Sequence, residues 1–193
     1  YTMRLVERPG NGVRRALVIA GSDRRGAAHG LISLSRVIGV SPWYWWADAP
    51  VTPRERLTLH VEGFTSKTPT VKYRGVFIND EDWGIYRWAK NNFEKELGNI
   101  GPKTYEKVCE LLLRLQANYL APAMHDATTA FYRIPENKVI ADRYAIAIGS
   151  SHCEPLLLNT ASEWDAKRYG PWDYVRNKKG VDSVLTARVR DAA

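Results

Sequence analysis

Apolar segments with strand character alternate with helical segments after residue 70, and this alternation constrains the fold more than any other feature of the chain. Three strands are predicted there, at residues 71–78, 118–124 and 144–149. Two helices separate them, at residues 103–116 and 136–143. Strands that alternate with helices pair in parallel through right-handed crossovers. The sequence therefore predicts a βαβαβ arrangement in this part of the chain.

The segment before residue 62 has its own strand and helix pattern. A continuous apolar run at residues 15–20 predicts a buried strand, and residues 24–38 predict a helix that ends at Gly39. Ser22 or Asp23 is the expected cap of that helix, which explains the turn at residues 21–26 more simply than a phosphate-binding loop does.

A polar linker with Gly and Pro separates the two parts of the chain. Residues 56–61 alternate between apolar and polar side chains and predict one more strand before this linker at residues 62–70. We place the domain boundary in the linker, which gives domains at residues 1–66 and 70–193.

Composition excludes two classes of partner. The 193 residues include 28 Lys and Arg against 21 Asp and Glu, a net charge of +7, but the basic residues form scattered pairs and no nucleic-acid-binding signature is present. Cationic side chains around a cleft for an anionic ligand are the alternative explanation of the positive charge. No window reaches the ~18 consecutive apolar residues of a membrane span. Cys109 and Cys153 lack metal-ligand spacing, so no metal and no cofactor are predicted.

Polar side chains follow each of the three predicted strands. In parallel α/β folds, functional groups gather where the strands end. The residues that we expect to contact a ligand there are Asn79, Asp80, Glu81, Trp83, His125, His152 and Glu154. Trp83 suits stacking on a sugar ring. Three alternatives remain open. Asp80 could cap a helix, and His125 could be a structural histidine. The whole set could also consist of solvated turn residues.

An unusual aromatic cluster lies at residues 43–46, Trp-Tyr-Trp-Trp. Indole faces pack on sugar rings and also fill protein cores. The cluster therefore indicates either a carbohydrate groove or packing between domains, and the sequence leaves both open.

A series of collinear blocks resembles family 115 of the glycoside hydrolases, the xylan α-1,2-glucuronidases. The resemblance covers residues 16–177, and its blocks lie at residues 21–26, 41–48, 71–83, 98–105, 111–118, 122–125 and 149–155. It implies an α/β fold in which residues 1–66 are the C-terminal part of a small α/β accessory domain. Residues 70–193 would be the N-terminal part of a (β/α)8 (TIM) barrel, with its first three βα units.

The resemblance also implies an activity and a setting. The activity is release of glucuronic acid, and of its 4-O-methyl form, from α-1,2-linked side chains of glucuronoxylan or its oligosaccharides by an inverting mechanism. The enzyme would be extracellular or periplasmic, and the full-length protein could be a homodimer. Members of the family are several times longer, so we expect a fragment that is inactive alone and aggregates because its sheet edges are uncovered.

Glycoside hydrolysis usually needs two carboxyl groups, one of them a proton donor. Asp80 and Glu154 are the candidates here, but the sequence assigns neither role, since loops beyond the third strand also supply catalytic groups in the family. Two other functions remain open: a glycosidase of different sugar specificity, and a non-catalytic carbohydrate-binding fragment.

Overall fold

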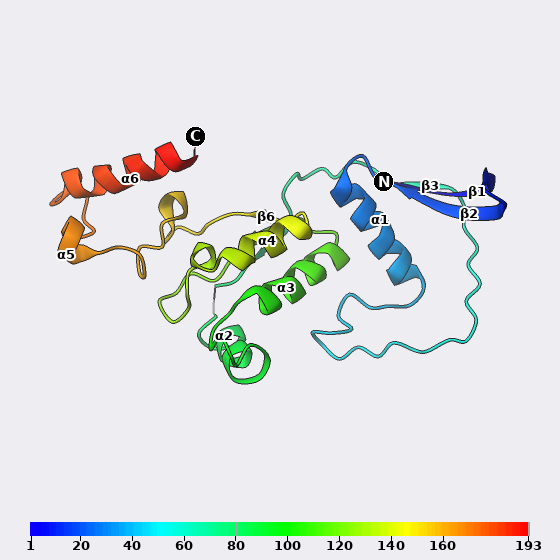
Figure 1. Cartoon of the computed structure of the whole chain (residues 1–193), viewed down its shortest axis with the longest axis horizontal. Helices are drawn as coiled ribbons and strands as arrows, with labels where there is room; N and C mark the ends of the chain where they lie inside the picture. The colour runs from blue at the N-terminus through cyan, green and yellow to red at the C-terminus, as the bar shows by residue number, and fades with distance from the viewer. Residues whose placement is uncertain (80, 193) are drawn as a thin grey trace. The chain divides into compact units, whose positions relative to one another are not determined.

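The computed structural model of the chain describes residues 1–79 and 81–192, and it forms two compact units (Figure 1). The first unit comprises Tyr1–Arg74 with Val108–Asn118, and the second comprises Gly75–Lys107 with Tyr119–Ala193. Among the described residues, no helix has both the length and the apolar character needed to span a bilayer.

The first unit contains a small antiparallel sheet. Strands β1 (Thr2–Gly10) and β2 (Val13–Ala20) form a hairpin, and β3 (Phe64–Thr65) pairs with the other edge of β1. The strand predicted at residues 15–20 is therefore confirmed as part of β2. Its burial was predicted wrongly, because the residues of β2 are exposed or half-buried.

The strand predicted at residues 56–61 is wrong, since this segment has no regular structure. A strand needs a neighbouring backbone to complete its hydrogen bonds. The free edge of β1 instead pairs with Phe64 and Thr65, opposite Met3 and Thr2. Alternation of side chains alone did not locate the paired residues.

Helix α1 (Arg24–Val37) confirms the predicted helix and its cap. The Asp23 carboxylate accepts a hydrogen bond from the backbone N–H of Gly26 at 2.7 Å. The turn before the helix is tight, because a Cβ atom at Gly21 would lie 2.1 Å from the backbone nitrogen of Ala27. The segment is thus a capped helix start, as the sequence indicated.

The second unit contains the predicted parallel sheet. Its strands are β4 (Gly75–Phe77), β5 (Tyr119–Ala121) and β6 (Ala147–Ile148), hydrogen-bonded in the order β4-β5-β6. All three are shorter than predicted. Gly75 permits the close approach of β4 to β5, since a Cβ atom there would lie 1.7 Å from the carbonyl oxygen of Tyr119.

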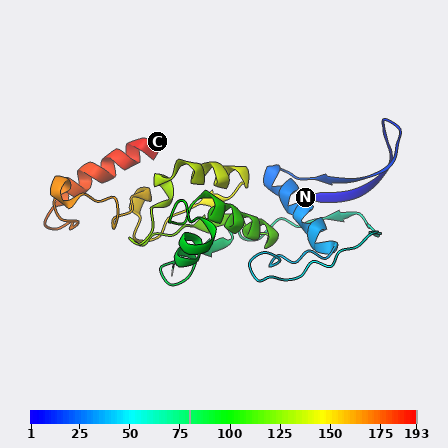
Figure 2. The same ribbon diagram turned by 60° about the horizontal axis from the view of Figure 1, so that its bottom comes forward.

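Helices α3 (Pro102–Arg114) and α4 (Pro135–Arg143) separate these strands in the sequence, as predicted. Figures 1 and 2 both show them side by side, and the Tyr144 hydroxyl, just after α4, donates to Glu106 Oε1 of α3 at 3.1 Å. The α/β fold class is therefore confirmed.

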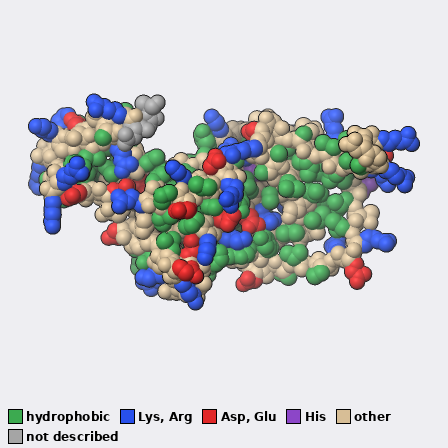
Figure 3. Space-filling model, in the orientation of Figure 1, with side chains coloured by type: hydrophobic (Ala, Val, Ile, Leu, Met, Phe, Trp, Pro, Cys, Tyr) green, Lys and Arg blue, Asp and Glu red, His purple; other side chains and the backbone are tan. Residues whose placement is uncertain are grey.

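Several helices were not predicted. They are α2 (Ile85–Trp88) with the π-helical turn Ala89–Phe93, the 3₁₀ turns Phe131–Arg133 and Pro155–Leu157, α5 (Ala166–Tyr169) and α6 (Lys178–Ala192). Lys and Arg side chains gather over α5 and α6 (Figure 3).

A buried carboxylate caps the start of α3. Glu94 is almost fully buried, and its two oxygens accept hydrogen bonds from the backbone N–H groups of Gly101, Lys103 and Thr104 and from the Thr104 hydroxyl. These backbone groups have no partner within the helix, so Glu94 satisfies donors that would otherwise be buried without one.

We expect Glu94→Ala to destabilise the protein by about 2–4 kcal/mol, because it leaves several buried donors unpaired. Glu94→Gln should cost less than Glu94→Ala, since one of its two terminal atoms still accepts hydrogen bonds. Urea unfolding of the whole natural protein measures both.

The matched control is Glu96→Ala, two residues away. Glu96 is exposed, and its carboxylate lies 3.7 Å from Lys103 Nζ, so its loss should change stability much less than the loss of Glu94 does. Equal effects of Glu94→Ala and Glu96→Ala would contradict the capping role.

Candidate functional site

The segments that follow the three parallel strands meet at the backbone of Met124. Glu81, after β4, accepts hydrogen bonds at Oε1 from the backbone N–H groups of Met124 and His125, each at 2.6 Å. Asn159, after β6, donates from Nδ2 to the Met124 carbonyl oxygen at 2.7 Å and to Glu154 Oε1 at 3.3 Å. These contacts bring the segments that carry Glu81, His125 and Glu154 together at this edge of the sheet.

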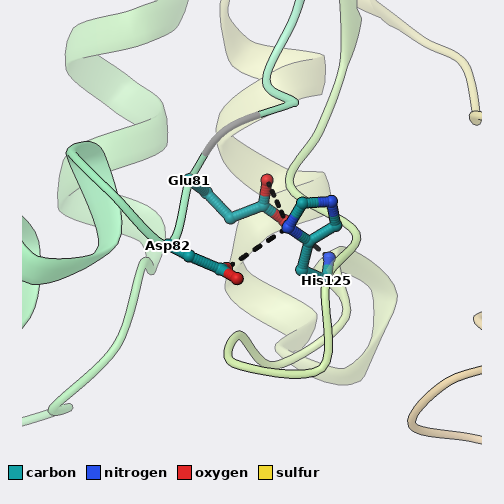
Figure 4. A group of neighbouring side chains, drawn as sticks. All are labelled: Glu81, Asp82 and His125. Carbon is teal, nitrogen blue, oxygen red and sulfur yellow. Dashed lines mark hydrogen bonds and ion pairs between the residues drawn. The ribbon is translucent and has the colours of Figure 1, made fainter.

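Glu81, Asp82 and His125 form a compact cluster at this convergence (Figure 4). His125 Nδ1 lies 3.3 Å from Asp82 Oδ1 and 3.7 Å from Glu81 Oε2. Glu81 is fully buried, whereas the side chains of His125 and Asp82 are 32% and 39% exposed. Solvent therefore reaches the side chains of His125 and Asp82 but not that of Glu81.

Glu154 is a second buried carboxyl group in this region, with 1% of its surface exposed. Burial raises the pKa of Glu154 because it removes water from the charged form, and the carboxylates of Glu163 and Glu81 raise it further. The hydrogen bond from Asn159 opposes this shift. A carboxyl group that keeps its proton to higher pH is suited to proton donation.

Two further residues of the site were not predicted. Burial raises the pKa of Tyr132 to about 12, and electrostatic repulsion from the nearby Glu154 carboxylate contributes to this shift. Its hydroxyl therefore stays protonated and can donate a hydrogen bond. Asn159 was also missed, although an amide close after a strand-end carboxylate is a signal for such a bridge.

The remaining predicted residues stand apart from the cluster or cannot be placed. Asn79, Trp83 and His152 are exposed, Trp83 by 80%. In the part of the chain that the structure describes, no hydrogen bond links these three side chains to the cluster. Asp80 lies outside the described residues.

The first unit holds a separate polar cavity of about 610 Å³ near the start of α1. Four cationic residues line it: Arg25, Lys67, Lys72 and Arg74. His29 also borders it, and its Nε2 lies 3.1 Å from the carbonyl oxygen of Ala117. Burial lowers the pKa of His29.

The aromatic cluster at residues 43–46 is partly anchored within the first unit. The Tyr44 hydroxyl donates to Glu110 Oε1 at 2.8 Å, and the Arg114 guanidinium lies over the Tyr44 ring at 4.6 Å. Trp45 and Trp46 pack edge to face, while Trp43 is 46% exposed. The contacts of Tyr44 are therefore packing contacts within the first unit. The ring of Trp43 is still partly exposed to solvent.

Comparisons with known proteins point to one family. The sequence profile of glycosyl hydrolase family 115 matches residues 66–193. A solved structure, BtGH115A, is similar to 98% of this chain at 41% sequence identity and a TM-score of 0.75. That protein is described as a family GH115 4-O-methyl-α-glucuronidase with specificity for decorated arabinogalactans. This chain spans 25% of its length. A search of curated proteins finds no match.

The raised pKa of Glu154 predicts a pH-dependent contribution to stability. A carboxyl group that binds its proton more tightly in the folded state stabilises the fold below its ordinary pKa, 4.5, and loses this contribution as pH rises through the raised value. The Glu154→Gln variant, which is neutral throughout, should therefore lose less stability than wild type between mildly acidic and alkaline pH.

Urea midpoints of the whole natural protein over this pH range test the expectation. Glu136→Gln is the control, because Glu136 is exposed and carries the same charge. Identical pH profiles for wild type and Glu154→Gln would show that Glu154 has no such linkage.

Proposed function

Because this chain belongs to glycosyl hydrolase family 115, we propose that it is part of an enzyme that releases glucuronic acid from polysaccharides. The substrate that we propose is glucuronoxylan or its oligosaccharides, with glucuronic acid or its 4-O-methyl form α-1,2-linked as side chains. The observation that carries this proposal is the convergence of Glu81, His125 and Glu154 at the ends of three parallel strands.

The proposed architecture follows from the sheet. Three parallel strands in the order β4-β5-β6, with helices between them in sequence, have the order that begins a (β/α)8 barrel. We propose that residues 70–193 form its first three βα units and that residues 1–66 belong to an accessory domain. Additional strands would supply further catalytic groups.

The proposed roles of the site residues differ with their burial. We propose Glu154, whose pKa is raised, as one candidate catalytic carboxyl group, and Asp80, which lies outside the described residues, as the other. Glu81 holds the loop that carries His125. The exposed residues Asn79, Trp83 and His152 are free to approach a sugar from solvent.

An inverting reaction would use two carboxyl groups about 6.5–9.5 Å apart, with water attacking from the opposite face of the sugar. We propose this route for the whole enzyme. Glu154 would then protonate the leaving oxygen, or its partner from a later strand would do so. We propose that His125 takes part in recognising the sugar.

The setting of the enzyme follows from its substrate. Plant polysaccharides are too large to enter a cell intact, so we propose an extracellular or periplasmic location. We also propose a homodimer for the full-length protein, as the family resemblance implies.

One observation favours a second substrate. BtGH115A is described as specific for decorated arabinogalactans, so glucuronic acid on arabinogalactan is the alternative. A glycosidase of other specificity, or a carbohydrate-binding fragment without catalysis, would release no glucuronic acid from either polymer.

We expect Glu154→Gln and His152→Ala each to lower release of glucuronic acid by at least about tenfold in the whole natural protein, because each removes a proposed hydrogen-bonding contact with the sugar. The measurement is uronic acid release from glucuronoxylan and, in parallel, from arabinogalactan. The ratio of the two wild-type rates identifies the preferred polymer.

His60→Ala is the control, since His60 is exposed and lies in the first unit. Its rate should match that of wild type, and the melting temperatures of all variants should be similar. Rates within about twofold of wild type for both site variants, less than one lost hydrogen bond would cause, would place Glu154 and His152 outside the active site.

A further inference from the structure

The Glu81, Asp82 and His125 cluster contains two buried carboxylate oxygens that its hydrogen bonds do not satisfy. Glu81 Oε2 and Asp82 Oδ1 are both inaccessible to solvent, and neither has a hydrogen-bond partner among the described residues. Both face Nδ1 of His125 (Figure 4). A buried oxygen of this kind costs free energy unless something pairs with it.

The histidine alone cannot satisfy both oxygens. Nδ1 of an imidazole carries at most one hydrogen, so it can donate to Asp82 Oδ1 or to Glu81 Oε2 but not to both. One carboxylate oxygen would remain unpaired in a buried position. A cation among the three groups would instead bind both oxygens and the lone pair of an unprotonated Nδ1.

We propose that Glu81, Asp82 and His125 bind one divalent transition-metal ion of the zinc type. The three candidate ligand atoms, Nδ1 and one oxygen from each carboxylate, lie within 4.8 Å of one another. Metal–ligand bonds of about 2.1 Å place neighbouring ligand atoms roughly 3–3.5 Å apart. The observed separations of 3.3 and 3.7 Å from Nδ1 are close to that range.

The ligand types select the class of metal. One imidazole nitrogen with two carboxylate oxygens suits zinc and its neighbours among the first-row divalent ions, whereas calcium and magnesium prefer oxygen ligands alone. Three protein ligands leave a coordination position open, and the partial exposure of His125 and Asp82 places that position toward solvent.

The backbone already fixes the deepest ligand. Glu81 Oε1 is held by the N–H groups of Met124 and His125, so Oε2 is directed at the cluster before any ion arrives. Such outer hydrogen bonds orient metal ligands in known sites. The inference does not depend on the proposed sugar chemistry, because it concerns binding of the metal alone.

The test is a zinc titration of the whole natural protein after removal of metals with a chelator, by calorimetry at about pH 7.5, where histidine ligands are unprotonated. We expect wild type to bind one more equivalent of Zn²⁺ than Asp82→Asn, or to bind it at least about tenfold more tightly. His125→Gln should show the same loss. Zinc should also raise the melting temperature of wild type more than that of either variant.

Asp126→Asn is the matched control, since Asp126 is the exposed neighbour of His125 and the change in charge is the same. It should bind zinc as wild type does. Failure of wild type to bind zinc, or equal binding by Asp82→Asn and Asp126→Asn, would overturn the metal site. Neither outcome bears on uronic acid release, which is measured separately.

Discussion

The site depends on one buried carboxylate that joins the ends of two strands. Glu81 follows β4, and its Oε1 accepts the N–H groups of Met124 and His125 beyond β5. Peptide N–H groups without a partner are costly once buried, so this single oxygen fixes where the β5 loop can lie. Asn159 fixes the β6 loop in the same way through the Met124 carbonyl group.

The two buried carboxyl groups differ in how they are satisfied, and their chemistry differs accordingly. Glu81 Oε1 receives two short hydrogen bonds from backbone N–H groups. Glu154 receives a longer bond from Asn159 at 3.3 Å, and burial raises its pKa although the hydrogen bonds from Asn159 and Ser151 oppose the shift. One edge of the sheet thereby combines a carboxylate that orders the backbone with a carboxyl group that retains its proton to higher pH.

The sequence predicted the elements whose signals are local and missed those that depend on distant partners. Apolar spacing located α3, and short apolar runs located β5 and β6. Helix α6 was missed because its charged and small residues, including Gly180, form no clear apolar face. The hydrogen bond from the Met124 backbone N–H to Glu81 joins residues 43 positions apart. Because its donor is a backbone group, no pattern of side chains in the sequence predicts it.

Among the described residues, buried oxygens of Glu81, Asp82 and Glu154 lack a hydrogen-bond partner. A protein interior normally pairs such atoms, which is why we propose that groups from outside the chain complete them. Glu81 and Asp82 share a histidine nitrogen, an arrangement that suits a cation. Glu154 has no such neighbour and suits a hydroxyl donor, as a sugar would supply. Binding of such ligands would offset the free energy that the unpaired oxygens cost the folded protein.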